Sequence, residues 1–290
     1  MRILVTGAGG TAAHNLITCL HAAGHETVGT DCSTTFLAAS PADKKYKVPH
    51  VAHEDDWRPA LQEIEYRNQT DLTMPQPDAE VLACAKLPYP VVSYLPSYEV
   101  IERCQDKLRT AEDLEIAGVP VPHSVWADND PDLISALHEV TMMWQRPAWI
   151  RAARGAGTRA AILARDEVTA RAWIRHWRLE TDDPFMACEY LPGREFAWQG
   201  VYDSRSVVVA SFGRERIEPL FGHLSPSGTS STPAISRTLD ANDSERVAAL
   251  GLAAVRVMDE TPAGVFGVDM KEDEHRVLRV TEVNAGRFFT

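Results

Sequence analysis

The first hundred residues alternate between short apolar runs and segments with helical spacing, and this alternation constrains the fold more than any other feature of the chain. Strand-like runs are predicted at Arg2–Thr6, Glu26–Thr30, Asp71–Met74 and Val91–Ser93. Helical spacing is found at Thr11–Ala23, Asp56–Tyr66 and Asp78–Lys86. Strands separated by helices are typical of a parallel sheet with helices on both faces. We therefore predict an α/β domain over residues 1–105.

The pattern changes after residue 105, and an α+β domain is predicted over residues 106–290. Its helices are predicted at Lys107–Ala117, Pro131–Met143, Arg165–Trp177 and Ser244–Met258. Its strands are predicted at Ala148–Arg151, Arg159–Leu163, Phe185–Tyr190, Glu195–Tyr202 and Ser206–Phe212. Runs of strands with few helices are typical of α+β folds. The boundary between the two domains is placed between Ser97 and Asp106.

The composition excludes several classes of protein. With 290 residues, of which 44% are hydrophobic, the chain has enough apolar material for two domains with sizeable cores. The formal net charge of -12 argues against a nucleic-acid partner, because such proteins need a basic face. No apolar run approaches the length of a membrane span, and no leader pattern precedes the first strand. The cysteines include no CxxC pair, so we expect no disulfide framework and a cytoplasmic location.

A glycine turn separates the first predicted strand from the first predicted helix. It contains Gly7, Gly9 and Gly10, and Asp31 ends the second strand, an arrangement that resembles a dinucleotide site of the Rossmann type. The third glycine of the GxGxxG pattern is replaced by Ala12. A tight turn that binds no nucleotide explains the same residues. An NAD(P)-dependent oxidoreductase therefore stays open as an alternative function, although no catalytic Tyr-xxx-Lys pair is evident.

A second motif lies near the C-terminal end of the sequence. A strand that contains Asp269 and a strand that contains Glu282 and Asn284 are joined by a charged turn, as in a hairpin. Glu282 and Asn284 are two residues apart and so share one face of their strand. Oxygen ligands without nitrogen or sulfur suit Mg²⁺ or Mn²⁺, which often bridge nucleotide phosphates. Arg287 follows closely and is a candidate for neutralising a transferred phosphoryl group. A solvated acidic hairpin is the plain structural alternative.

Two further segments have the residue types of a nucleotide site. Arg151 ends a strand and leads into a loop with Gly155 and Gly157, whose amides are suited to covering phosphates. The segment Glu189–Glu195 surrounds a Pro-Gly turn between two strands. Such a hinge offers backbone groups to an adenine edge and a carboxylate to a ribose. Taken alone, each segment is equally explained as an ordinary turn.

In this order, the motifs resemble those of the ATP-grasp superfamily, and the resemblance covers most of the chain. The chain looks most similar to the large chain of carbamoyl-phosphate synthetase and to related carboxylate–amine ligases. The entry into the nucleotide domain is matched by Gln105-Asp106-Lys107 and by the segment Ala117–Pro122. The resemblance implies a Rossmann-like pre-ATP-grasp domain over residues 1–105, an ATP-grasp domain over residues 106–290, and a lid at about residues 122–188.

The resemblance also implies a role for each candidate residue. Phosphate binding is implied for Lys107, Arg151, Gly155 and Gly157, and binding of adenine and ribose for Glu189, Tyr190, Leu191 and Glu195. Metal binding is implied for Asp269, Glu282 and Asn284. A catalytic role is implied for Arg287 and also for Arg151. One departure stands out. Relatives often have Asn-Pro-Arg, whereas Ala285 and Gly286 separate the asparagine from the arginine here.

The implied reaction uses ATP and Mg²⁺ or Mn²⁺ to phosphorylate a carboxylate. An amine then attacks the acyl phosphate, which gives an amide or peptide bond, ADP and phosphate. Phosphorylation of a carboxyl or carbamate group, as in carbamoyl-phosphate synthetase, is a second alternative. The partners are small-molecule carboxylate and amine substrates, and a homodimer is left open. Arg214, Arg216, His223 and the loop Ser225–Thr232 are candidates for holding a substrate anion.

Overall fold

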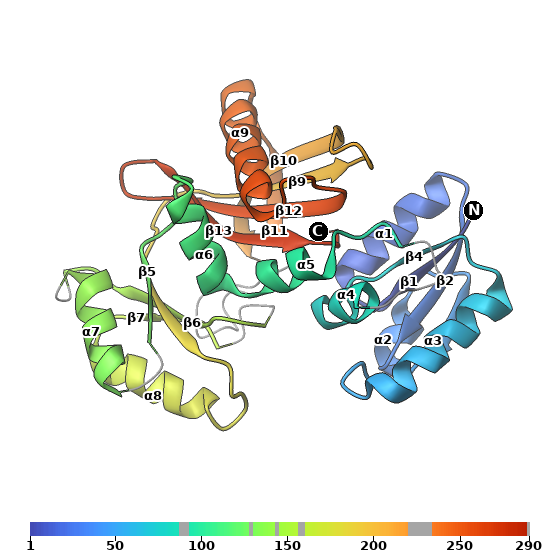
Figure 1. Cartoon of the computed structure of the whole chain (residues 1–290), viewed down its shortest axis with the longest axis horizontal. Coiled ribbons are helices and arrows are strands. Elements are labelled where there is room, and N and C mark those ends of the chain that lie inside the picture. Colours follow the sequence, from blue (N-terminus) through green and yellow to red (C-terminus); the bar gives the residue numbers. More distant parts are fainter. Residues whose placement is uncertain (87–92, 128–129, 143–144, 156–159, 220–233, 289–290) are drawn as a thin grey trace.

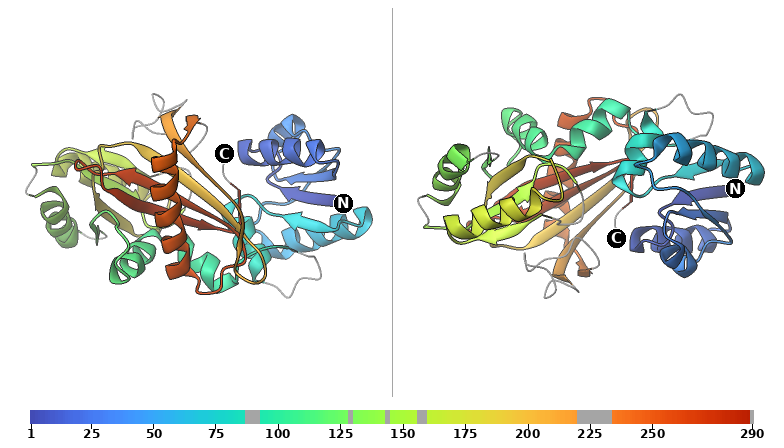
Figure 2. Two further views of the ribbon diagram at one scale, coloured as in Figure 1. Left: turned by 90° about the horizontal axis from the view of Figure 1, so that it is seen from above. Right: turned by 90° about the horizontal axis from the view of Figure 1, so that it is seen from below.

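The computed structural model describes the chain except for residues 87–92, 128–129, 143–144, 156–159, 220–233 and 289–290. The described strands form three sheets. In Figures 1 and 2 the largest sheet lies in the middle of the molecule, with a parallel α/β layer on one side and a smaller antiparallel sheet on the other. The chain therefore consists of mixed α/β sheets, as the strand and helix patterns predict.

The first sheet is built from the alternating region of the sequence. Its strands, in the order β3-β2-β1-β4, pair in parallel throughout. Their bounds are β1 (Arg2–Thr6), β2 (Glu26–Asp31), β3 (Lys44–Lys47) and β4 (Leu72–Met74). The helices of this part are α1 (Thr11–Ala22), α2 (Thr34–Ala39), α3 (Glu54–Asn68) and α4 (Asp78–Ala85).

Both faces of this parallel sheet are covered. Leu4 of β1 packs with Trp57 and Leu61 of α3, whereas the neighbouring Val5 packs with Ile17 of α1. Successive strand residues point to opposite faces, so a run of consecutive apolar residues in β1 can be buried on both. The prediction of a parallel sheet with helices on both faces is confirmed for this part of the chain.

The second, smaller sheet belongs to the predicted lid region. Its antiparallel strands have the order β5-β8-β6-β7. Their bounds are β5 (Ser124–Trp126), β6 (Ala148–Ala152), β7 (Ile162–Ala164) and β8 (Phe185–Glu189). Helices α7 (Asp130–Thr141) and α8 (Glu167–Trp177) pack on it through a separate apolar cluster that includes Leu137, Ile174 and Phe185.

The third sheet is antiparallel, with the order β11-β10-β9-β12-β13. The strands are β9 (Glu195–Tyr202), β10 (Val208–Pro219), β11 (Ala234–Thr238), β12 (Gly264–Glu272) and β13 (Leu278–Ala285). Helix α9 (Ala241–Met258) packs on one face, where Gly251 lies so close to Trp198 that an added Cβ would be 2.6 Å from its ring. The opposite face of the sheet is left for polar side chains.

Two consecutive helices connect the three parts. Helix α5 (Tyr98–Gln105) and helix α6 (Lys107–Ile116) meet at Asp106, whose carboxylate accepts a hydrogen bond from the amide of Arg109 at 3.1 Å and caps α6. Ile101 of α5 and Val81 of α4 belong to the same apolar cluster as β12 and β13. The third sheet therefore shares its core with helices that precede residue 106.

Some elements have no signal in the apolar pattern. Strand β3 reads Lys-Lys-Tyr-Lys and lies at the edge of its sheet, where charged residues are common. Helices α2 and α5 are short, and strands β5 and β11 are also absent from the prediction. Most of the predicted strand Val91–Ser93 lies outside the described residues.

Two buried carboxyl groups make the α/β part sensitive to pH. Burial raises the pKa of Glu65 and of Glu80 to about 7. One oxygen of Glu65 accepts a hydrogen bond from the hydroxyl of Thr73 at 2.7 Å, and this bond opposes the shift only in part. A carboxyl group whose pKa is raised on folding stabilises the fold below its unfolded pKa, and this contribution is lost as the pH rises through the folded value.

We expect Glu65→Gln to be more stable than the parent at pH 8.5 by about 1–3 kcal/mol, and to show no such advantage at pH 5. Urea unfolding at the two pH values measures the difference. Glu63→Gln, an exposed change on the same helix, is the control and should shift stability little at either pH. An equal effect of Glu65→Gln at both pH values would show that Glu65 does not titrate in this range.

Candidate active site

The segment Gln105-Asp106-Lys107 contacts all three parts of the structure. The Gln105 amide donates a hydrogen bond to the backbone carbonyl of Asp78 in α4 at 2.8 Å. Asp106 forms an ion pair at 3.2 Å with Arg154, which follows lid strand β6. The Lys107 ammonium donates to the carbonyl of Gly155 and lies 3.8 Å from Glu282 on β13. The segment therefore links the α/β part, the lid and the large sheet.

The predicted hairpin is formed by β12 and β13, and it brings the predicted metal ligands together. Asp269 and Glu282 are direct cross-strand partners, and Asn284 pairs opposite Gly267, two positions further along. Residues directly opposite each other in an antiparallel pair point to the same side of the sheet with close Cβ atoms. Asp269, Glu282 and Asn284 are therefore gathered on one face.

A β-bulge at Thr281 sets this arrangement. Asp269 pairs with Glu282 but Met270 pairs with Val280, so Thr281 is an extra residue on β13. The bulge explains why both Val280 and Val283 are buried although they are three apart on a strand. It leaves the Thr281 carbonyl free of the ladder, and the guanidinium of Arg151 donates to it at 2.8 Å. This hydrogen bond joins β6 of the predicted lid region to β13.

Two cations of the predicted phosphate site surround Glu282. Its carboxylate lies 3.8 Å from the Lys107 ammonium and 3.9 Å from the Arg151 guanidinium. Burial alone would raise the pKa of Glu282, but Lys107 and Arg151 outweigh it and hold the pKa below its usual range. Burial lowers the pKa of Lys107, and the attraction of Glu282 opposes that shift. Glu282 is thus an ionised carboxylate at the centre of a basic environment.

Asp269 has a cation of its own. Arg216 on β10 lies 2.8 Å from Asp269 and donates to Glu195, at the start of β9, at 2.9 Å. Burial raises the pKa of Asp269, and Arg216 acts against that shift. Arg214 lies two residues away on the same face, and burial lowers its pKa. These contacts place Arg216 beside the predicted metal and ribose ligands.

The predicted hinge joins the lid to the large sheet. Glu189 ends β8, where its amide donates to the His123 carbonyl at 2.8 Å and its carboxylate lies 3.8 Å from Arg146. The Lys271 ammonium lies 5.8 Å from the centre of the Tyr190 ring, and Leu191 is buried. Glu195 then starts β9. The segment therefore connects β8 of the small sheet to β9 of the large sheet, and its predicted role in binding adenine and ribose stays a prediction.

Arg287 reaches the same site in spite of its unusual spacing. Its guanidinium donates to the side-chain oxygen of Asn284 at 2.8 Å and forms an ion pair with Asp78. Asp78 begins helix α4, and its position there carries no sequence signal of a site. Of the loop glycines, Gly155 is described, with a positive φ of 91°. Gly157, together with His223 and the loop 225–232, lies outside the described residues.

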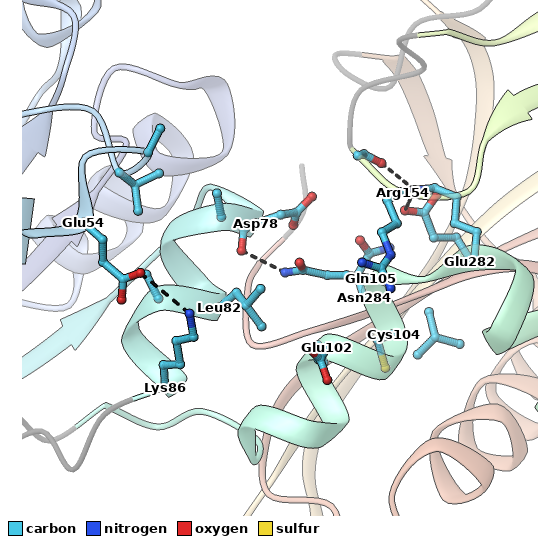
Figure 3. A pocket seen from close by; sticks show the side chains of 18 of the residues that line it. Glu54, Asp78, Leu82, Lys86, Glu102, Cys104, Gln105, Arg154, Glu282 and Asn284 are labelled. Carbon is cyan, nitrogen blue, oxygen red and sulfur yellow. Dashed lines mark hydrogen bonds and ion pairs between the residues drawn. The ribbon is translucent and has the colours of Figure 1, made fainter. Parts of the chain in front are cut away.

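A cavity of about 500 Å³ opens beside these residues, between α4, α5 and β13. Figure 3 shows Glu282, Asn284 and Arg154 at one end of the cavity, and the ion pair of Lys86 with Glu54 at the other. Leu82 and Cys104 provide an apolar wall. Two of the predicted metal ligands, Glu282 and Asn284, therefore line a space that is large enough for a small molecule.

The residues fit a hard divalent cation in the nature of their donors. Asp269, Glu282 and Asn284 offer only oxygen atoms from neighbouring strands, and such donors suit Mg²⁺ or Mn²⁺. Among the described residues, no group of three or more His, Cys, Asp and Glu side chains has the arrangement of a metal site. The predicted set is a different one, because it consists of two carboxylates and an amide.

The glycine turn of the α/β part is occupied by its own chain. The amide of Gly9 donates to the Asp31 carboxylate at 3.1 Å, and the amide of Gly10 donates to the Gly7 carbonyl at 2.9 Å. A Cβ on Gly9 would lie 2.3 Å from the backbone of Phe36 in α2. The glycines therefore permit close packing of α2, and the contacts of Asp31 favour a structural turn over a dinucleotide site.

Comparison with known proteins supports the fold. No known family model and no curated protein sequence matches the chain. A carboxyaminoimidazole ribonucleotide synthase from Aspergillus clavatus, complexed with ATP, has 18% identity and a TM-score of 0.72, over 100% of this chain and 71% of that one. A biotin carboxylase complex from Campylobacter jejuni has 17% identity and a TM-score of 0.71, over 100% of this chain and 66% of that one. An L-amino acid ligase from Bacillus licheniformis has 12% identity and a TM-score of 0.68, over 99% of this chain and 66% of that one.

These structures share one architecture, that of the ATP-grasp proteins. The chain has this ATP-grasp fold over its whole length, and the resemblance predicted from its motifs is confirmed at the level of the fold. Within the described part of the chain, no helix combines the length and the apolar character that crossing a bilayer requires. All five cysteines are free thiols.

The shared cation Arg216 gives a test of the site that needs no ligand. Its side chain is only 10% exposed, so Arg216→Met leaves Asp269 and Glu195 without their common partner. We expect a loss of about 2–4 kcal/mol in unfolding free energy at pH 7. Adding Asp269→Asn should recover part of that loss, because the uncompensated charge is then removed. Urea unfolding of the single and double variants measures both effects, and strictly additive losses would contradict the pairing.

Proposed function

We propose that the protein is an ATP-dependent carboxylate–amine ligase that forms an amide or peptide bond through an acyl phosphate. One observation carries the proposal. Asp269, Glu282 and Asn284 share a face of the large sheet, and Lys107 and Arg151 lie directly over Glu282. Carboxylates that hold a divalent cation and cations that hold phosphates are both required, side by side, for phosphoryl transfer from a nucleoside triphosphate. Solved structures of this fold include complexes with ATP.

ATP is proposed to lie between the lid sheet and the large sheet. Glu189, Tyr190 and Leu191 of the hinge would meet the adenine, and Glu195 would accept hydrogen bonds from the ribose. Lys107 and Arg151 would hold the phosphates, together with the loop that contains Gly155 and Gly157. The contact of Arg151 with the Thr281 carbonyl supports this placement, because it aims a lid cation at the metal strand.

Mg²⁺ or Mn²⁺ held by Asp269, Glu282 and Asn284 would neutralise charge on the phosphates during transfer. Side chains of the protein would provide the remaining stabilisation of the transferred group. Arg287 is held beside Asn284 and would stabilise negative charge on the phosphoryl group as it moves to the substrate carboxylate. No protein nucleophile is required, because the substrate carboxylate attacks the γ-phosphate itself.

The carboxylate substrate is proposed to bind in the cavity between α4, α5 and β13. This cavity opens onto Glu282 and Asn284, so a carboxylate there would lie next to the phosphates. The amine would enter the same space and attack the acyl phosphate, with release of phosphate. A lid at about residues 122–188 would exclude water from the intermediate, since hydrolysis competes with the amine. We place the protein in the cytoplasm, in keeping with its free thiols.

Nucleotide choice separates this proposal from the oxidoreductase alternative. We expect ATP with magnesium to raise the melting temperature and NAD(H) to leave it unchanged, because a ligand stabilises only the fold that binds it. At a ligand concentration about 100 times the dissociation constant, the gain is about 2.7 kcal/mol. Thermal melting with each nucleotide is the measurement, and a shift with NAD(H) alone would overturn the ATP-grasp function.

Glu282→Gln tests the proposed chemistry directly. The variant should fold but melt below the parent without nucleotide, because the amide fits the same space and leaves Lys107 and Arg151 without their charged partner. It should lose nearly all ADP release with magnesium and saturating ATP, assayed against a panel of amino acids and small carboxylic acids, because an anionic ligand is gone.

The matched control is Glu245→Gln, the same change at an exposed position of α9 on the other face of the sheet. It should melt and turn over as the parent does. If Glu282→Gln turns over at the parent rate, Glu282 is no metal ligand and the proposed mechanism is wrong.

A further inference from the structure

The position of Arg287 depends on the α/β part of the chain. Its guanidinium touches both oxygens of Asp78, through an ion pair at Nε and a hydrogen bond of 3.4 Å from a terminal nitrogen. That same terminal nitrogen donates to Asn284 at 2.8 Å. One side chain therefore joins helix α4 to a predicted metal ligand on β13.

The backbone before Arg287 is shaped to make this contact. Gly286 has a positive φ of 87°, and its amide donates to the Val265 carbonyl at 2.7 Å. A Cβ at Gly286 would lie 2.8 Å from the side chain of Val81 in α4. A glycine is needed here for both its conformation and the close approach. Gly286, which lengthens the segment relative to the Asn-Pro-Arg pattern, thus lets the backbone pack closely against α4. Arg287 lies beside Asp78 as a result.

Asp78 is held in place from its other side. It is the first residue of α4, after Pro77, and its backbone carbonyl accepts a hydrogen bond from Gln105. Figure 3 shows this bond on the wall of the cavity that also contains Asn284 and Glu282. The side chain of Asp78 is only 25% exposed. A carboxylate fixed in this way restricts the guanidinium of Arg287 to one orientation.

We propose that Asp78 is a positioning residue, which holds Arg287 against Asn284 so that the α/β part completes the phosphoryl-transfer site. The inference rests on the proposed function and extends it, because it assigns to helix α4 a part in the chemistry. A bidentate contact between an arginine and a carboxylate fixes direction as well as distance. Small losses of orientation in such a site reduce the rate strongly. A purely structural ion pair would affect stability alone.

The test is a double-mutant cycle of Asp78→Asn and Arg287→Gln in the ADP-release assay. Asp78→Asn should lower kcat about 10- to 100-fold and change the KM for ATP less than about threefold, because binding of ATP does not need the oriented guanidinium. In the Arg287→Gln background, Asp78→Asn should cost less than about threefold, because the group that it positions is already missing.

The matched control is Asp113→Asn. Asp113 pairs with Arg103 at 2.6 Å, and this pair is about as exposed as the pair of Asp78 with Arg287. It lies between α5 and α6, and the further hydrogen bonds of Arg103 go to backbone carbonyls at the end of α9. It should lower the melting temperature and leave kcat unchanged. If Asp78→Asn behaves in the same way, or if it costs as much without Arg287 as with it, the positioning role is refuted.

The same four proteins are also unfolded in urea. Coupling between Asp78 and Arg287 in that cycle shows whether the pair forms, whatever the protein catalyses. If the parent chain neither binds nor turns over ATP with magnesium, the proposed function is refuted. The proposed role of Asp78 is then refuted as well, even where the pair is coupled in unfolding. A parent that turns over ATP while the kinetic cycle shows no coupling refutes the role of Asp78 alone.

Discussion

The ionised carboxylate of Glu282 is the point on which the site depends. Its side chain is only 23% exposed, and a half-buried charge without partners would be unfavourable. Lys107 and Arg151 provide the compensating charge, and they come from a helix start and from a lid strand. Lys107 and Arg151 are themselves largely buried, and the Glu282 carboxylate compensates their charge in turn. Electrostatic compensation therefore ties three separate segments to one face of the large sheet.

Other contacts at the seam between the three parts follow the same logic. Asp106 both caps α6 and pairs with Arg154 of the lid, and Gln105 holds the first turn of α4. Arg287 makes a further connection, from β13 to Asp78. Val81 and Ile101 add apolar packing against the large sheet at this seam, so the charged contacts act together with a shared core.

The motifs differ in what their residues contact in the structure. The glycine turn with Asp31 has the residues of a dinucleotide site, yet its amides are used by Asp31 and Gly7, and α2 packs against it. The hairpin residues Asp269 and Glu282 are less conspicuous in the sequence, but the strand register places them directly opposite each other. Spacing alone does not distinguish a glycine that binds phosphate from a glycine that allows close packing.

The sequence by itself determined the parallel α/β start, the later antiparallel strands and the types of residue gathered at the site, because apolar periodicity and residue chemistry are local properties. It also placed Glu282 and Asn284 on one face. Only the tertiary structure decided the bulge at Thr281, the pairing of Arg216 with Asp269, and the contact of Arg287 with Asp78. Asp78 and Arg287 are 209 residues apart. Such contacts depend on how whole elements pack, and no local pattern in a single chain encodes that.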